Sequence, residues 1–391
     1  MKKLIKKIVP VFLLDSYHYS LAAIGAFLYG FPSRKLTVIG ITGTSGKSTV
    51  VELTARILEE AGFKTASLSS IKFKIGKKER ENRLKMTMPG RLKLQRFLRK
   101  ALKADCKYVV LEVTSEGIKQ YRHKFIDFDV AVLTNLSPEH IEVHGGFEKY
   151  REAKLKLFKA VKNIHIINID DKNSEYFLKI PAEKKIGYGI NDAGILPKDL
   201  KLLGKFNLYN AIAATKIGLS QDISLEICKK ALEKVKGIPG RMEIVIKEPF
   251  TVVVDYAHTP EALEKVYKTF KDNRMICVLG SCGGGRDKWK RPVLGKLAAE
   301  YCQEIIVTNE DPYDEDPMEI ITQVAKGAEG KAQKILDRRK AIKKALELAK
   351  PNDVVVITGK GSEPWMCVEK GKKIPWDDRK IVREEYNNLT K

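Results

Sequence analysis

Short, almost wholly apolar runs alternate with stretches of helical periodicity along most of the chain. Four runs lie in the first half: Leu36–Thr42, Tyr108–Val113, Val130–Thr134 and Ile164–Ile169. Four more follow Gly240: Phe250–Val254, Met275–Leu279, Glu304–Thr308 and Asp353–Thr358. Such runs are typical of parallel strands that helices cover on both faces. The pattern predicts an α/β protein with two domains.

The boundary between these domains is expected near Lys236–Gly240, where two glycines and a proline interrupt the helical periodicity. We therefore expect an N-terminal helical segment over 1–35, a first α/β domain over 36–238 and a second over 239–391. The chain shows no solenoid-type repeat and no low-complexity tract.

The N-terminal segment begins with four lysines, followed by an apolar stretch from Ile8 to Phe31 that polar residues and Pro10 interrupt. The spacing of its apolar residues favours a buried or surface-lying helix. A basic amphipathic segment resting on the inner membrane face is the second interpretation. A spanning helix or a cleaved signal is disfavoured, because about 20 clean apolar residues are needed to cross a bilayer.

Charge points to an anionic partner. The 391 residues carry 72 Lys+Arg against 49 Asp+Glu, a formal net charge of +23. Residues 71–103 hold 13 Lys+Arg and 2 Glu, which is either a solvated helical face or a rim that attracts a polyanionic substrate. Phe73 and Phe97 are the only aromatics there, so we expect no nucleic acid as partner.

Six scattered cysteines, none in a CxxC pair, argue against a disulfide framework or a zinc ribbon. They fit a reducing cytoplasm.

The clearest chemical motif is GITGTSGKST at residues 40–49, which follows one strand and opens a helix. Glycines let the backbone wrap around phosphate oxygens, and the exposed N–H groups favour the anion. Lys47 would reach the β- and γ-phosphates, and the Ser48 hydroxyl would face Mg²⁺. The glycine spacing departs from the standard Walker A motif, so this is a variant phosphate loop.

This loop and a series of further motifs resemble the Mur ligases, the ATP-dependent amide-forming enzymes of peptidoglycan synthesis. Residues 111–117 (LEVTSEG), 128–145, 150–158 (YREAKLKLF) and 204–214 (GKFNLYNAIAA) look like the central domain of that family. Residues 237–243, 254–263 (VDYAHTPEAL), 283–295, 308–317 and 358–365 look like its C-terminal domain. The resemblance covers roughly residues 36–385 and is strongest to the tripeptide synthetase branch.

The resemblance implies a P-loop-containing central domain, a Rossmann-like C-terminal domain and ADP-forming acid–amino-acid ligation with ATP and Mg²⁺. The acid would become an acyl phosphate that an amino acid then attacks. By the same resemblance, these residues would bind ATP: Gly43, Thr44, Ser45, Gly46, Lys47, Ser48, Thr49, Asn207, Arg241 and Asp255. Arg241 and Asp255 lie in the C-terminal domain, so we expect domain closure.

Four residues would be catalytic by this resemblance: Lys47, Glu112, His140 and Lys154. By resemblance Glu112 and His140 are magnesium ligands beside Ser48, although imidazole is an unusual ligand for a hard cation. Lys154 matches a lysine that is carbamylated in the family, which would turn a repelling ammonium into an oxygen donor. Without the surrounding motif, Lys154 would be interpreted as an exposed helical lysine.

Seven residues fall where the family holds its two other substrates. Thr87, Ser115 and Arg122 match positions that hold the muramoyl peptide, although Glu116 replaces a common histidine nearby. Arg286, Asp311, Gly359 and Glu363 match the pocket for the incoming amino acid, where Ser362 again replaces a histidine. The partners implied are a muramoyl-peptide-like acid and an amino acid. The protein is expected to be a monomer.

Two departures from the family lead to specific expectations. Only 35 residues precede the first strand, too few for a domain that grips uridine diphosphate, so we expect UDP recognition to differ. Glu310-Asp311-Pro312-Tyr313 replaces the Asp-Asn-Pro-Arg typical of diaminopimelate-adding members. Losing the arginine that binds the distal carboxylate favours lysine, unless these acids face solvent.

Three other functions stay open from the sequence. A folylpolyglutamate synthetase-like ligase would share the central chemistry but take a pterin-bearing acid. A related amidotransferase partner typically carries a four-cysteine zinc ribbon, which this cysteine spacing does not provide. A basic membrane- or nucleic-acid-binding ATPase module would lack ligase activity altogether.

Overall fold

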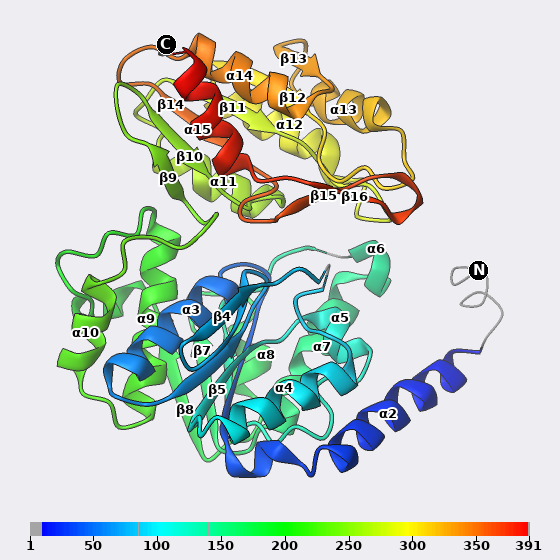
Figure 1. The fold of residues 1–391 in the computed structure, drawn as a ribbon, viewed down its shortest axis with the longest axis vertical. Coiled ribbons are helices and arrows are strands. Elements are labelled where there is room, and N and C mark those ends of the chain that lie inside the picture. Colours follow the sequence, from blue (N-terminus) through cyan, green and yellow to red (C-terminus); the bar gives the residue numbers. More distant parts are fainter. Residues whose placement is uncertain (1–9, 85, 140, 390–391) are drawn as a thin grey trace. The chain divides into compact units, whose positions relative to one another are not determined.

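The computed structural model describes residues 10–84, 86–139 and 141–389, which divide into two compact units (Figure 1). The first unit contains the described residues of Met1–Pro138, Phe147–Leu200 and Asn207–Val235. The second contains those of Glu139–Gly146, Lys201–Phe206 and Lys236–Lys391. The hydrophobic pattern did not indicate that two short segments of the expected first domain, Glu139–Gly146 and Lys201–Phe206, belong to the second unit.

The first unit is built on an eight-stranded sheet in the order β4-β3-β2-β5-β1-β6-β7-β8. The strands are β1 (Thr37–Thr42), β2 (Thr65–Leu68), β3 (Lys72–Ile75), β4 (Lys78–Glu81), β5 (Tyr108–Glu112), β6 (Val130–Leu133), β7 (Ile164–Asn168) and β8 (Lys184–Tyr188). All pair in parallel except β3 and β4, which form an antiparallel edge. The four predicted strands are confirmed as β1, β5, β6 and β7.

Helices accompany this sheet. They are α2 (Val11–Leu28), α3 (Lys47–Glu60), α4 (Arg91–Lys103), α5 (Ser115–Lys119), α7 (Phe147–Ala160), α8 (Ser174–Leu178), α9 (Lys205–Ser220) and α10 (Leu225–Glu233), with 3₁₀ turns η1 (Pro32–Lys35) and η2 (Ile190–Ile195). The basic stretch 71–103 is therefore a hairpin followed by α4, and the helical interpretation holds for its second part alone.

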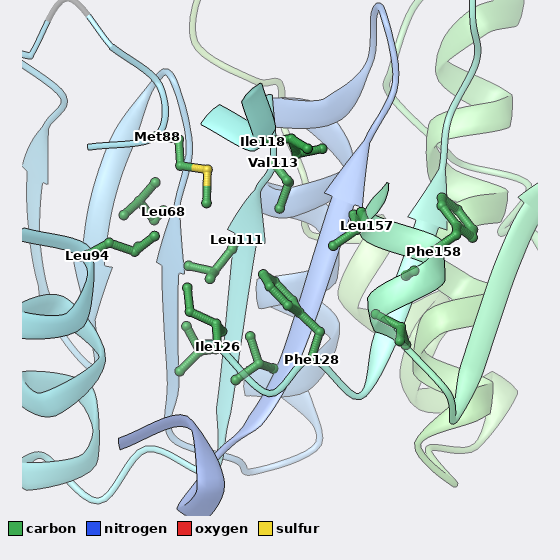
Figure 2. Packing of buried hydrophobic residues seen from close by; sticks show 14 of the residues in the cluster. Leu68, Met88, Leu94, Leu111, Val113, Ile118, Ile126, Phe128, Leu157 and Phe158 are labelled. Carbon is green, nitrogen blue, oxygen red and sulfur yellow. The ribbon is translucent and has the colours of Figure 1, made fainter. Parts of the chain in front are cut away.

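Large apolar side chains fill the space between this sheet and its helices. Leu68 of β2, Leu94 of α4 and Leu111 of β5 point toward one another (Figure 2). A Cβ atom added to Gly40 of β1 would lie 2.9 Å from the Phe128 ring. Gly40 thus lets Phe128 pack directly on the strand that leads into the phosphate loop.

The second unit has a six-stranded sheet in the order β13-β12-β11-β14-β10-β9. Its strands are β9 (Glu243–Ile246), β10 (Thr251–Val254), β11 (Met275–Leu279), β12 (Glu304–Thr308), β13 (Ala332–Ile335) and β14 (Val354–Ile357), with a separate hairpin of β15 (Trp365–Cys367) and β16 (Lys373–Pro375). Pairing is parallel except for β9. The predicted strands of this half are confirmed as β10, β11, β12 and β14.

The helices of this unit are α6 (Ile141–His144), α11 (Pro260–Thr269), α12 (Lys290–Tyr301), α13 (Pro317–Lys326), α14 (Arg338–Leu348) and α15 (Asp378–Leu389), with the 3₁₀ turn η3 (Glu369–Gly371). Helices α11 to α15 cover both faces of its sheet. Val253 packs into the cluster with α11–α13, and its neighbours Val252 and Val254 pack into the cluster with α14 and α15. This alternation explains the wholly apolar strands.

The expected N-terminal helix is confirmed as α2, which runs alongside α4 (Figure 1). Its buried residues Ala22, Gly25 and Ala26 form the contact, and a Cβ atom on Gly25 would lie 3.5 Å from the Leu92 Cα atom. The four N-terminal lysines lie outside the described residues. Over residues 10–84, 86–139 and 141–389, none of the helices is long and apolar enough to cross a membrane.

Candidate active site

The phosphate loop is a tight connection between β1 and α3. Gly43 has φ +150° and Gly46 has φ +81°, a conformation that side chains rarely adopt. A Cβ atom on Gly43 would lie 1.9 Å from the Thr134 Oγ1 atom, and one on Gly46 would lie 2.3 Å from the Asn210 Oδ1 atom. Both glycines are needed because the loop passes directly against neighbouring side chains.

The loop after β6 holds the phosphate loop in place. The Ser45 N–H donates to the Asn135 Oδ1 atom at 2.9 Å, and the Asn135 amide donates back to the Ser45 carbonyl at 3.1 Å. The Thr134 hydroxyl donates to the same carbonyl at 2.7 Å. The Thr44 hydroxyl lies 3.1 Å from the Tyr150 hydroxyl of α7. These contacts leave the loop little freedom before a ligand arrives.

Three predicted residues meet beside the loop. The Ser48 hydroxyl donates to the Glu112 Oε2 atom at 2.7 Å, and the Lys47 Nζ atom lies 4.0 Å from Glu112 Oε1. The Ser70 N–H also donates to Glu112 Oε2, at 2.9 Å. Lys47 further donates to the Thr44 carbonyl at 2.7 Å. Glu112 is the last residue of β5, so the sheet brings it to the start of α3.

The donor set beside the loop suits magnesium. Glu112 and Ser48 offer carboxylate and hydroxyl oxygens, which this hard cation prefers. The described residues contain no group of three or more His, Cys, Asp or Glu side chains that could hold a metal ion on their own. The predicted ligand His140 lies outside the described residues.

Lys154 of α7 is 1% exposed, so the interpretation as an exposed helical lysine is wrong. Its Nζ atom donates to the Gly43 carbonyl of the phosphate loop at 2.7 Å. The same atom lies 4.6 Å from the centre of the Tyr150 ring. Burial brings this ammonium to the loop, 111 residues away in the sequence.

Asn207 and Asn210 form a buried pair on α9, where the Asn210 amide donates to the Asn207 Oδ1 atom at 2.9 Å. Asn210 also abuts Gly46, which places the pair next to the start of α3. Thr49, in the first turn of α3, is buried. The structure therefore brings the central-domain residues of the predicted ATP site together.

The predicted muramoyl-peptide residues lie around α5. Arg122 donates to the Met88 carbonyl and, at 2.7 Å, to the Gln120 Oε1 atom. Thr87 precedes Met88, and a Cβ atom on Gly117 of α5 would lie 2.6 Å from the Met88 sulfur. Ser115 is buried at the first position of α5. Burial lowers the pKa of Arg122. Arg122 thus also fixes the backbone next to Thr87.

In the second unit, Arg241 and Asp255 lie near the end of β10. The buried Asp255 carboxylate accepts the Met242 N–H at 2.7 Å and the Ala257 N–H at 2.6 Å. The Arg241 guanidinium stacks on the Tyr256 ring, 4.2 Å from its centre. Burial raises the pKa of Asp255. Asp255 therefore connects the backbone just before β9 with the loop that follows β10.

Two predicted amino-acid-pocket residues, Asp311 and Glu363, are joined by a lysine that the sequence analysis missed. The fully buried Lys360 donates to the Asp311 Oδ2 atom at 2.9 Å and also to Glu363. Asp311 additionally accepts the Cys367 N–H at 2.6 Å. Asp311 is thus buried and paired, and does not face solvent. Arg286 is half-buried in the glycine-rich loop after β11.

Glu310 is the most unusual group in this pocket. It is buried, and its Oε1 atom accepts the Cys282 thiol at 3.0 Å. Its Oε2 atom has no hydrogen-bond partner in the described part of the chain, and a Cβ atom on Gly359 would lie 2.1 Å from it. Burial raises the pKa of Glu310. Gly359, at φ +105°, leaves this oxygen room.

The segment Glu139–Gly146 is held by residues of the second unit. The Lys290 Nζ atom lies 3.4 Å from Glu139 Oε1, and both side chains are buried. Asp287 accepts the backbone N–H groups of Ile141 at 3.2 Å and Glu142 at 3.1 Å. Asp287 and Lys290 belong to the GGGRDKWKRP motif. The sequence analysis identified this motif but did not predict its contact with Glu139–Gly146.

Two family models match the chain: the Mur ligase middle domain over residues 41–199, and the Mur ligase, glutamate ligase domain over residues 240–361. The UDP-N-acetylmuramoyl-L-alanyl-D-glutamate--2,6-diaminopimelate ligase of Syntrophomonas wolfei is 39% identical over 401 residues, covering 93% of this chain and 81% of its own. The UDP-N-acetylmuramyl-tripeptide synthetase of Roseiflexus sp. is 34% identical, covering 97% and 84%.

Solved structures agree on the fold. A UDP-N-acetylmuramoyl-L-alanyl-D-glutamate--2,6-diaminopimelate ligase, 31% identical, superposes with a TM-score of 0.59 over 91% of this chain and 79% of its own. The folylpolyglutamate synthase of Mycobacterium tuberculosis has a TM-score of 0.70 over 87% and 92%, but only 16% identity. That second likeness shows the shared fold alone.

Proposed function

This chain belongs to the Mur ligase family, and we propose that it is an ADP-forming ligase that adds an amino acid to a muramoyl-peptide-like acid in peptidoglycan synthesis. The observation that carries the proposal is the meeting of Lys47, Ser48 and Glu112 at the phosphate loop, with Lys154 hydrogen-bonded to the loop itself. These groups concentrate positive charge and oxygen donors where a γ-phosphate would lie.

The reaction has two balanced steps. A carboxylate oxygen of the acid forms a bond to the γ-phosphorus of ATP while the bond to the β-phosphate oxygen breaks and ADP leaves. The amino group of the amino acid then attacks the acyl carbon, phosphate departs, and the nitrogen loses a proton. Lys47 would stabilise the charge on the phosphoryl group in the first step. Bound Mg²⁺ would add to this neutralisation, held by Ser48 and Glu112.

Lys154 is proposed to carry an N6-carbamate. Its neutral amine would form a bond to the carbon of CO₂ and release a proton, which exchanges a cation beside the phosphates for an anion that offers oxygens. Its burial against Gly43 supports this role. In ¹³C-bicarbonate the wild-type protein should show a carbamate carbon signal that Lys154→Arg lacks. Identical spectra would contradict the modification whatever the activity.

We propose that the incoming amino acid is lysine or another diamine-like amino acid, although the name of the Syntrophomonas relative specifies diaminopimelate. Arg286 would bind the α-carboxylate and Glu363 the amino group. Tyr313 stands where the family's arginine is expected. Glu310, three residues before it, has an Oε2 atom with no hydrogen-bond partner among the described residues. An ammonium-tipped side chain would satisfy that oxygen, whereas a second carboxylate would be repelled.

A muramoyl-L-alanyl-D-glutamate type of acid is proposed as the other substrate, near Thr87, Ser115 and Arg122. The chain is proposed to act as a monomer in the cytoplasm, with the inner face of the membrane as a place of peripheral contact. No nucleic acid is expected to take part.

The deciding experiment measures phosphate release from ATP and Mg²⁺ with UDP-N-acetylmuramoyl-L-alanyl-D-glutamate or its UDP-free form, with and without an amino acid, and identifies the product by mass. We expect release that depends on both substrates and is lost in Lys47→Ala. Release without an amino acid would indicate a bare ATPase. Turnover of pterin-bearing acids alone would favour a folylpolyglutamate synthetase-like activity.

A further inference from the structure

The helix α2 exposes an unusual amount of apolar surface. Seven of its large hydrophobic side chains are exposed, among them Phe12 at 67%, Phe27 at 76% and Leu28 at 66%. The others are Leu13, Tyr17, Ile24 and Tyr19, whose ring also contacts Phe125 edge-on. At about 100° per residue, all seven fall within an arc of about 180° around the helix axis. They form one face, which we call the apolar face of α2.

The apolar face lies on the side of α2 that α4 does not cover. The contact with α4 uses Ala22, Gly25 and Ala26, which lie outside that arc. The N-terminal half of α2 extends beyond the rest of the first unit (Figure 1). A helix that is hydrophobic all round normally has partners on every side. One side of α2 packs against α4. The other exposes an apolar surface of the kind that marks an interaction site.

Exposed basic residues lie on the neighbouring helix α4. Lys93, Arg96, Lys100 and Lys103 of α4 are exposed and recur at helical spacing, so they form a basic stripe on the helix that supports α2. Asp15 is the only acidic residue of α2. Four more lysines (Lys2, Lys3, Lys6 and Lys7) precede α2 in the sequence. The occupant should therefore be apolar inside and anionic at its surface.

We propose that the apolar face of α2 rests in the headgroup region of an anionic lipid bilayer, with the α4 basic stripe facing the lipid phosphates. Aromatic and aliphatic side chains enter the acyl boundary, and each nearby lysine or arginine adds attraction to anionic headgroups. A second copy of this chain fits less well, because two-fold pairing of this face would bring two basic stripes together. The helix lies in the interface plane, since it does not qualify as a spanning helix.

The test is co-sedimentation of the full-length protein with phosphatidylcholine vesicles that contain or lack phosphatidylglycerol, at two salt concentrations. We expect binding to the anionic vesicles that weakens as salt rises. Phe12→Asp/Phe27→Asp should lower the partition coefficient at least about tenfold, because it puts charge on the inserted face. Lys93→Glu/Lys100→Glu should lower it by about tenfold or more.

Matched controls lie in the second unit. Ile374→Asp changes an exposed isoleucine, and Lys331→Glu/Lys334→Glu changes two exposed lysines, so both should bind vesicles like the wild type. Unchanged melting temperatures and unchanged amino-acid-dependent phosphate release in solution would show that the α2 and α4 variants fold. Vesicle binding itself does not depend on the ligase assignment.

Equal binding of all variants, or no binding by the wild type, would overturn the proposal. A wild-type dimer that Phe12→Asp/Phe27→Asp converts to a monomer without vesicles would assign the face to a second copy instead, and would overturn it too.

Discussion

Glu112 and Lys154 are buried charged side chains whose contacts converge on one loop. Glu112 reaches it through the Ser48 hydroxyl, and Lys154 reaches it through the Gly43 carbonyl. Burying charge costs free energy unless close partners compensate it, so such residues are usually retained for chemistry. Their position at the phosphate loop makes them the most informative single substitutions.

We expect Glu112→Ala and Lys154→Ala each to lower kcat/KM for ligation by at least about 100-fold, because each removes a group that organises the phosphates and metal. Lys156→Ala, an exposed neighbour on α7, is the matched control and should leave the rate unchanged. Circular dichroism checks the fold. Turnover near the wild-type value in Lys154→Ala, without any added anion, would contradict this role.

The amino acid specificity is expected to depend on the pocket around Glu310 and Tyr313. We expect kcat/KM for lysine or ornithine to exceed that for meso-diaminopimelate by about tenfold, since the pocket has a buried carboxylate and no arginine at position 313. Tyr313→Arg should move the ratio toward diaminopimelate. A clear wild-type advantage for meso-diaminopimelate would show that its distal carboxylate is recognised elsewhere.

His123 gives a stability prediction with a definite sign. Burial lowers its pKa to about 4 from 6.5, so the folded state prefers the neutral ring. As pH falls below 6.5 the unfolded chain binds the proton first, and stability is lost until pH approaches 4. About 2 kcal/mol should disappear between pH 7 and pH 5 from this group.

Urea unfolding of the wild type and His123→Asn at both pH values measures this effect. The difference in unfolding free energy between the two proteins should shift by about 2 kcal/mol in favour of the variant at pH 5. A difference that does not change with pH would contradict the buried neutral histidine.

At the scale of elements, buried ion pairs tie helices together in the second unit. Arg338 opens α14 and is 1% exposed. It donates to both Asp378 carboxylate oxygens at the start of α15, at 2.9 and 2.7 Å, and to the Thr358 carbonyl after β14. One guanidinium therefore joins two helices to the strand end that leads to Gly359.

Arg338→Ala should destabilise the protein by about 3–5 kcal/mol, because it leaves the Asp378 carboxylate buried without its partner. The adjacent Arg339 is itself exposed and pairs with the exposed Glu384 and the buried Glu385, so Arg339→Ala should cost less, about 1 kcal/mol. Thermal unfolding of both variants compares them directly. An equal loss of stability in both variants would show that the buried pair contributes no more than the contacts of Arg339.

At the scale of the whole molecule, two α/β units share a chain that crosses between them several times. Residues 10–36 form α2 and η1 within the first unit. The expectation that UDP recognition differs from that of the family predicts that the uridine diphosphate group of a nucleotide-linked substrate contributes little binding. Free UDP and UDP-sugars should compete weakly with the acid substrate. Their inhibition constants should be at least about tenfold higher than the KM of the acid.

Steady-state inhibition with UDP, UDP-N-acetylglucosamine and ADP as a positive control measures this competition. Tight UDP inhibition would instead show that the basic stretch 71–103 or α2 binds the diphosphate.

Much of the fold followed from local pattern. Eight apolar runs were found as strands, since a strand buried on both faces must be apolar at every position. Among the missed strands, β4, β8, β9 and β13 lie at sheet edges, where sequences such as KERE carry charges that resemble a solvated segment. The phosphate loop was recognisable because its glycines, lysine and serine are consecutive in the chain.

What tertiary structure decided were the long-range partners. The sequence motifs named Lys154, but packing buried it and directed it to Gly43. They named Asp311 and Glu363, but Lys360 joins them, and Glu310 kept one oxygen without a partner in the described chain. The sequence alone determined which groups are available, because motif residues are local. Contacts between distant residues depend on strand order and burial, and both are set only when the chain folds.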